Sequence, residues 1–338
     1  CTGARIHSGA ADMKRLLTLL LALGLMPLSA CSGHAKQETL TVTSYASGPN
    51  PQGRFFATAG PSDNEADLYY LLVGNGVSLY ALTDSHRTFG VDGCDKSLTV
   101  NVAGADVDFQ DALRHFDAGT LSPIDGLGDG KGALASVARD CRMVFVRLDR
   151  TTNPPTDHLM LFDPATRAQR ELYAPGSQKV LGVAGWSPDG RVAVFEGTAP
   201  SDNHPTVPTA IVIIRPDGST TNLAPPVSSL GTLQWGAKWL AISDEQNHKT
   251  LFVDPDSGER TELDGWTPLA WSPDGSELIV ADAAERKTLA LVESTSPGVA
   301  HRLGRTQKVQ FETFLWLPLG ASAGGSLPVG RRADDGGQ

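Results

Sequence analysis

The sequence predicts an all-β fold, a six-bladed β-propeller of four-stranded antiparallel blades, with seven blades as the alternative. The first observation behind this prediction is a repeated unit in which a tight turn leads into an apolar strand. Its two clear copies are AGWSPDGRVAVFEG at 184–197 and LAWSPDGSELIVAD at 269–282. The second observation is that weaker copies recur at intervals in the low-to-mid forties, a period typical of propeller blades.

The weaker copies keep different parts of the unit, and they are NPQGRFFATAG (50–60), KSLTVNVAGAD (96–106), ARDCRMVFVRL (138–148) and LQWGAKWLAIS (233–243). The strands after the turns are then expected to begin near residues 54, 98, 142, 191, 238 and 277. Helical repeats have similar periods. The segments here are short and apolar without a 3.6-residue pattern, which indicates strands.

The residues of the repeat have structural roles. A Pro fixes the first corner of a tight turn, and Asp and Gly suit its later positions. A Trp before the turn is large enough to fill the wedge between neighbouring blades. The residues assigned to this motif are Trp186, Pro188, Asp189, Gly190, Trp235, Trp271, Pro273, Asp274 and Gly275. We interpret both Asp residues as turn residues and not as acid/base catalysts.

The second half of each unit predicts an outer hairpin, an apolar strand followed by a polar one. These segments are 78–91, 158–172, 210–223, 250–263 and 288–303. Ring closure has two candidates. TLTVTSY (39–45) could form the first strand of the first blade, or FETFLWLPLG (311–320) could pair with the start of the ring. The propeller is expected to span 39–318, followed by a disordered tail at 319–338.

The N-terminal region predicts an export signal. Residues 1–12 are interpreted as an untranslated or non-native leader. Residues 13–30 combine Lys14 and Arg15 with a short apolar stretch, as a signal peptide does. The Leu-Ser-Ala-Cys ending resembles a bacterial lipoprotein cleavage box, which implies lipidation of Cys31, for example with palmitate, followed by a tether at 31–38. A plain secretory peptide in which Cys31 is incidental is the alternative.

Composition and cysteine usage narrow the function. The chain has 338 residues, 36 Gly, 22 Pro and a formal net charge of −10. An acidic chain without a basic cluster argues against nucleic-acid binding, which needs a Lys/Arg surface. In an exported protein Cys94 and Cys141 form a candidate disulfide. Two isolated cysteines do not indicate a metal site.

Tandem WSPDG turns, each followed by an apolar strand, in an exported lipoprotein resemble the TolB-like β-propeller repeat family. The resemblance covers roughly residues 40 to 318. It implies a six-bladed propeller in periplasmic or cell-surface proteins that bind other proteins or envelope components.

Catalytic motifs are scarce, and we assign no catalytic residue, metal ligand or cofactor. GASAG (320–324) formally matches a nucleophile elbow, but no His follows it and it fits a flexible tail. His158, His204 and His248 are expected in outer loops. DGLGDGKG (125–132) is interpreted as an inter-blade loop and not as a calcium loop.

The candidate binding surface consists of two long Pro-containing connections, TTNPPTD (151–157) and TAPSDNHPTVPTA (198–210), on adjacent blades. The sequence favours a lipid-anchored, extracytoplasmic propeller that binds an envelope protein or cell-wall component. It would lie in the periplasm or on the cell surface, on the outer membrane if the source has one. The alternative is an exported lyase or hydrolase with its site at the central channel, and a cluster of His, Asp and Glu in the channel would favour that alternative.

Overall fold

A computed structural model describes residues 40–41, 43–44, 51–62, 65–73, 77–83, 87–102, 112–117, 120–127, 133–149, 156–176, 179–198, 207–224, 227 and 231–324. The chain divides into Cys1–His34 and Ala35–Gln338, and every described residue belongs to the second unit. The predicted leader, signal peptide, lipidated Cys31 and tether therefore lie outside the described residues. Within the described ranges, no helix is long and apolar enough to cross a membrane.

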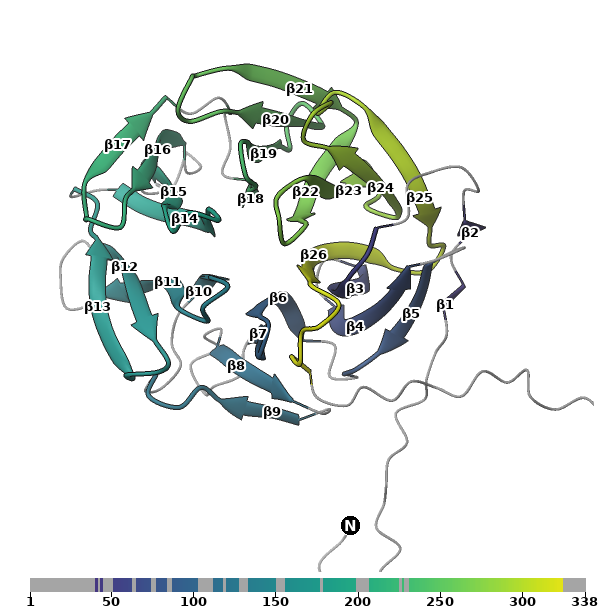
Figure 1. Ribbon diagram of the computed structural model, residues 1–338, viewed down its shortest axis with the longest axis horizontal. Coiled ribbons are helices and arrows are strands. Elements are labelled where there is room, and N and C mark those ends of the chain that lie inside the picture. The colour runs from purple at the N-terminus through teal and green to yellow at the C-terminus, as the bar shows by residue number, and fades with distance from the viewer. Residues whose placement is uncertain are drawn as a thin grey trace, which may run out of the picture. The chain divides into compact units, whose positions relative to one another are not determined.

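The second unit is a six-bladed β-propeller, as predicted. Six antiparallel sheets surround a central opening, and each contributes one strand to its rim (Figure 1). The blades are listed here from the innermost strand outwards. Blade 1 is β26 (Gln310–Leu317), β3 (Arg54–Ser62), β4 (Glu65–Val73) and β5 (Val77–Ala81). Blade 2 is β6 (Thr88–Cys94), β7 (Ser97–Val102), β8 (Ala112–Asp117) and β9 (Thr120–Pro123).

The other four blades follow the same order. Blade 3 is β10 (Ala133–Val137), β11 (Met143–Asp149), β12 (Thr156–Asp163) and β13 (Ala168–Tyr173). Blade 4 is β14 (Lys179–Trp186), β15 (Val192–Thr198), β16 (Pro208–Ile214) and β17 (Thr220–Leu223). Blade 5 is β18 (Leu233–Trp235), β19 (Leu240–Asp244), β20 (Lys249–Val253) and β21 (Arg260–Asp264). Blade 6 is β22 (Trp266–Trp271), β23 (Glu277–Asp282), β24 (Thr288–Glu293) and β25 (Ala300–Arg305).

The predicted repeat is confirmed strand by strand. The second strands of the six blades begin at Arg54, Ser97, Met143, Val192, Leu240 and Glu277, each within two residues of its expected start. The interpretation of 78–91 as an outer hairpin is wrong. β5 ends blade 1 within this segment and β6 begins blade 2, so the segment connects two blades.

The C-terminal strand closes the ring. β26 pairs with β3 from Gln310 opposite Gly60 to Leu317 opposite Arg54, which confirms the pairing expected for 311–320. The alternative, that residues 39–45 form the innermost strand of blade 1, is wrong because β26 occupies that place. Instead β1 (Leu40–Thr41) pairs with the outer strand β5, and β2 (Thr43–Ser44) pairs with the outer strand β25. The N-terminal segment thus crosses from blade 1 to blade 6 along the outer edge of the propeller.

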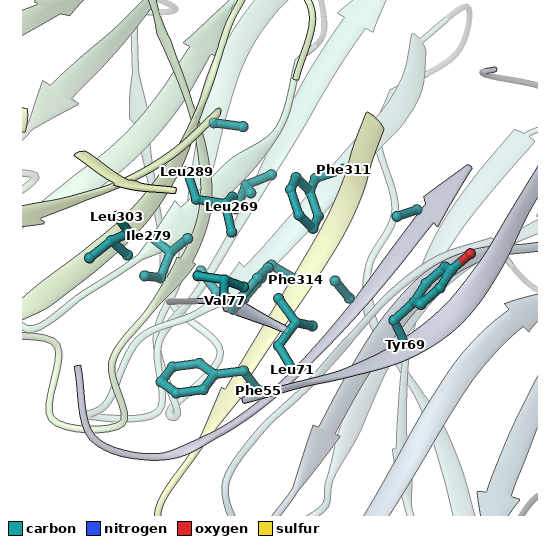
Figure 2. Packing of buried hydrophobic residues seen from close by; sticks show 14 of the residues in the cluster. Phe55, Tyr69, Leu71, Val77, Leu269, Ile279, Leu289, Leu303, Phe311 and Phe314 are labelled. Carbon is teal, nitrogen blue, oxygen red and sulfur yellow. The ribbon is translucent and has the colours of Figure 1, made fainter. Parts of the chain in front are cut away.

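The seam is also filled by a hydrophobic core. Leu269, Ile279, Leu289 and Leu303 of blade 6 meet Phe55, Leu71, Phe311 and Phe314 of blade 1 (Figure 2). Because both blades contribute large buried side chains, the closure is held by packing as well as by the β26–β3 ladder.

The first residues of the expected tail are ordered. Ala321 is 7% exposed and Ala323 is fully buried, and both pack against blade 2. The backbone N–H groups of Ser322 and Ala323 donate to the carbonyl oxygen of Asp95, at 2.7 and 3.0 Å. The tail prediction therefore fails for 319–324, and residues 325–338 lie outside the described residues.

Candidate functional site

The two WSPDG turns have the same hydrogen bonds. The N–H groups of Gly190 and Gly275 donate to the carbonyls of Ser187 and Ser272, and both glycines have positive φ, at 87° and 71°. Pro188 and Pro273 occupy the turn positions between Ser and Asp. The Ser272 hydroxyl donates to Asp274 at 2.6 Å and holds the pKa of that carboxyl below its usual value. Asp189 likewise accepts from Ser187 and pairs with Arg191. Both carboxylates are placed as turn residues.

The tryptophans lie at the ends of innermost strands and pack between blades. Trp186 packs between blades 3 and 4, and Trp271 between blades 5 and 6. The Nε1–H of Trp186 donates to the carbonyl of Ser136 at 3.0 Å, and that of Trp271 to Gln234 at 3.2 Å, each in the preceding blade. Trp235 packs between blades 4 and 5, but its buried Nε1–H has no hydrogen-bond partner among the described residues.

Cys94 and Cys141 are joined by a disulfide that links the end of β6 to the turn before β11. It therefore ties blade 2 to blade 3. Cys141 has φ of +69°, the conformation that Gly190 and Gly275 adopt at the same place in the WSPDG turns. The N–H of Cys141 donates to the carbonyl of Ala138, as those glycines donate to Ser187 and Ser272.

A cavity of about 460 Å³ lies at the centre of the ring, lined by residues from all six innermost strands. This volume is within the range of small-molecule sites, about 300–1,000 Å³. Among the described lining residues, the tryptophans and the charged residues come from different blades. The four tryptophans come from blades 4, 5, 6 and 1, and they are Trp186, Trp235, Trp271 and Trp316. The charged residues come from blades 2 and 3, and they are Asp92, Asp95, Arg139, Asp140 and Arg142.

Asp92 on β6 holds blades 2 and 3 together at the wall of this cavity. Its Oδ1 accepts from the N–H of Gly93 at 2.7 Å, and its Oδ2 accepts from the N–H of Val137 at 2.8 Å. Burial raises the pKa of Asp92 to about 6, although these backbone hydrogen bonds and one from Ser136 act in the opposite direction. The carboxyl therefore titrates close to neutral pH.

A second polar cluster lies between blades 3 and 4, next to the ends of the two long connections. Glu196 is 2% exposed, accepts from the hydroxyl of Tyr173 at 2.5 Å and pairs with Lys179. Burial alone would raise the pKa of Glu196, but the hydrogen bonds from Lys179 and Tyr173 hold it below its usual value. Buried Asp157 accepts from the N–H of Leu181 in blade 4 at 2.8 Å.

His158 on β12 and Glu171 on β13 form a separate cross-strand pair on the other face of blade 3, the face that packs against blade 2. Their Nδ1 and Oε2 atoms are 2.6 Å apart, and the side chains are 21% and 51% exposed. The connections themselves join β11 to β12 and β15 to β16, the same pair of strands in adjacent blades, so they emerge on the same side of the propeller. Residues 150–155 and 199–206, which form most of these connections, lie outside the described residues.

The structure also locates other residues that the sequence analysis singled out. His248, with φ of +54°, lies in the turn between β19 and β20. His204 lies outside the described residues. Asp125, Gly126 and Leu127 lie between β9 and β10, which agrees with an inter-blade loop. Among the described residues, no group of three His, Cys, Asp or Glu side chains is arranged to hold a metal ion.

Sequence reasoning missed Asp92, the cavity-lining residue Asn101 on β7, and Glu196. The available signal for the first two was the weak second repeat, in which the turn motif and Trp are both lost. Glu196 sits inside an otherwise apolar strand, a position where a charged residue is expected to have a partner.

Comparison with known proteins supports the fold. Searches against protein-family models and against curated protein sequences find no match. Among solved structures, TolB from Acinetobacter baumannii aligns with a TM-score of 0.57 and 17% identity, over 79% of this chain and 67% of that one. A chain of a nidogen/laminin complex aligns with a TM-score of 0.55 and 14% identity, over 78% of this chain and 98% of that one. The chain shares the propeller fold of these structures, and this agrees with the resemblance seen in its repeats.

Proposed function

We propose that this protein is an exported, lipid-anchored propeller that binds a partner of the bacterial cell envelope, either a protein or a cell-wall component. The anchor is the lipid on Cys31, and the location is the periplasm or the cell surface. The Cys94–Cys141 disulfide supports an oxidising compartment outside the cytoplasm, because disulfides persist there.

The observation that carries the binding function is the pair of long connections on one side of blades 3 and 4. Two polar pairs lie near their ends, His158–Glu171 on blade 3 and Lys179–Glu196 on blade 4. Connections between adjacent strands are usually short, and long ones are often functional. The exposed members of these pairs, Glu171 and Lys179, carry opposite charges, which suits the polar rim of a protein interface. The nidogen/laminin structure is that of a complex, which supports this fold as a scaffold for protein recognition.

The experiment compares two double variants in a pull-down from membranes of the source organism. His158→Ala/Glu171→Ala removes a cross-strand pair from the candidate surface. Lys249→Ala/Glu262→Ala is the matched control, because it removes a pair at 2.8 Å with side-chain exposures of 21% and 54% on blade 5. We expect the first variant to lose a captured partner and the second to retain it. Equal capture by both variants counts against this surface.

Lipid anchoring has its own test. Labelled palmitate should be incorporated into the wild-type protein and not into the Cys31→Ala variant. Equal labelling of the two, or no labelling of the wild type, contradicts the anchor.

Asp92 favours a second candidate function, an exported lyase or hydrolase acting at the channel. A carboxyl whose pKa is near 6 in a cavity is suited to general acid/base catalysis. Turnover of a sugar, lactone or phosphate ester that is abolished by Asp92→Asn would support this candidate, and turnover that survives the substitution would remove it.

A further inference from the structure

The central cavity has an aromatic wall and a charged wall. β6 and β10 carry no Trp, whereas β14, β18, β22 and β26 each have a Trp at or next to the last residue of the strand, and β22 has a second, Trp266, at its first residue. In Figure 1, β6 and β10 lie across the central opening from β18 and β22. The cavity therefore offers apolar surface on one side and polar groups on the other.

Gly90 in β6 extends the cavity towards the second strand of blade 2. A Cβ at Gly90 would lie 3.3 Å from the Cβ of Asn101. The missing side chain leaves Thr99 and Asn101 of β7 as part of the cavity lining. This opening is specific to the blade that departs most from the repeat.

The polar groups on this wall are hydrogen-bond acceptors with capacity to spare. Asn101 Oδ1 is buried and has no hydrogen-bond partner among the described residues. Asp92 accepts one backbone N–H on each oxygen and a third hydrogen bond from the Ser136 side chain, while a carboxylate can accept about four. No Lys, Arg or His within the described ranges forms an ion pair with Asp92, and its pKa reflects burial and hydrogen bonds without a contribution from a neighbouring charge. An unpaired buried acceptor costs stability until a donor meets it.

Charged groups on the neighbouring elements do not supply that donor. They are Arg139, Asp140 and Arg142 in the turn after β10, His115 on β8, Glu312 on β26, Arg54 on β3, and Glu65 and Asp67 on β4. Arg142 pairs with Asp140 at 2.7 Å and lies over the ring of Trp186, and Arg54 lies over the ring of Phe56. The donor for Asp92 and Asn101 is therefore expected from a ligand.

We propose that the channel binds a small organic cation, an amine joined to an aromatic or apolar group. The ammonium group donates to Asp92 and Asn101, and the apolar part contacts the tryptophans of the opposite wall. Arrangements in which a cation meets a carboxylate and aromatic rings bind such ligands by charge and cation–π attraction. The proposal goes beyond the partner-binding function and is independent of it, since it needs neither the lipid anchor nor the surface on blades 3 and 4.

The test is calorimetric titration of the purified chain with three probes of matched size. Phenethylamine carries the cation, 2-phenylethanol is neutral, and phenylacetate is an anion. At pH 7.5 we expect the amine to bind at least about tenfold more tightly than the alcohol, and phenylacetate to bind most weakly. Because protonation neutralises Asp92, amine binding should weaken between pH 7.5 and pH 5.

Two variants test whether Asp92 and Asn101 are responsible for the tighter binding of the amine. Asp92→Asn should remove the advantage of the amine and leave binding of the alcohol within about threefold. Asn101→Leu should also weaken amine binding while raising the melting temperature, because it replaces a buried unpaired acceptor with apolar surface. This second variant keeps the test valid if Asp92→Asn folds poorly. Asp217→Asn, in the exposed turn after β16, is the control and should change nothing.

Three results would overturn the proposal. They are equal affinity for the three probes, absence of amine binding at millimolar concentration, and amine binding that is unchanged in both Asp92→Asn and Asn101→Leu. None of these results bears on the pull-down or on palmitate labelling, so the failure of this proposal is distinguishable from that of the proposed function.

Discussion

The disulfide between blades 2 and 3 gives a prediction whose size follows from the structure. Cys94 and Cys141 are 47 residues apart in the chain, and they connect the blade with the weakest repeat to its neighbour. Closing a loop of this length lowers the entropy of the unfolded chain enough to stabilise the fold by about 4 kcal/mol at 25 °C. With an unfolding entropy of about 2.1 cal/mol/K per residue over roughly 280 residues, this corresponds to a loss of about 7 °C in melting temperature.

The perturbation is Cys94→Ala/Cys141→Ala, followed by thermal unfolding under oxidising conditions. A second variant, Cys94→Ala/Cys141→Gly, removes the same disulfide but restores the residue that the other turns have at this place. Because Cys141 has φ of +69°, the glycine variant should be more stable than the alanine variant by about 1 kcal/mol. A melting temperature within about 1 °C of wild type in both variants would refute the entropic reasoning. Equal stability of the two variants would refute the account of the turn.

Three further predictions concern the ring. Trp271→Phe should cost about 1 kcal/mol more than Trp235→Phe in urea unfolding, because only Trp271 loses a hydrogen bond from its Nε1–H; equal costs would contradict this. The pKa of Asp92 is about 6 in the folded protein and 3.8 ordinarily, so the folded protein binds this proton more tightly than the unfolded chain does. Stability should therefore fall by about 2 kcal/mol as pH rises from 4 to 6, relative to Asp92→Asn; parallel pH profiles would count against it. Deletion of residues 39–44 should lower the melting temperature and promote association through the uncovered edges of β5 and β25, which light scattering would detect. A deletion variant that stays monodisperse would argue against a covering role for this segment.

The blades could be predicted from the sequence because each repeats the same local physics. A tight turn followed by an apolar second strand recurs around the ring, with Pro, Asp and Gly together in two of the turns. The second strand of blade 4 shows the pattern clearly, with Val192, Val194 and Phe195 all buried. Blade 2 has lost the Pro-Asp-Gly turn, but its weak copy at 96–106 falls at the repeat spacing and predicts a second strand starting near residue 98; the strand begins at Ser97.

What could not be predicted depends on pairing between distant segments. Residues 40–44 have the pattern of a strand, but nothing in that pattern distinguishes an inner strand from one that covers an edge. The segment 78–91 contains a turn between two strands, and only the ring assigns these strands to different blades. Asp92 on β6 and Val137 on β10 meet only because their blades are adjacent, so the polar wall of the channel was not visible in the local sequence.

The binding function is tested most directly by site-specific photo-crosslinking in intact cells of the source organism. A photoreactive residue is placed at Glu171, at the edge of the candidate surface, and in a separate protein at Glu262, which has the matching cross-strand pair on blade 5. We expect a discrete crosslinked envelope partner from position 171 and none from position 262. Crosslinks of equal yield from both positions, or from position 262 alone, would contradict it.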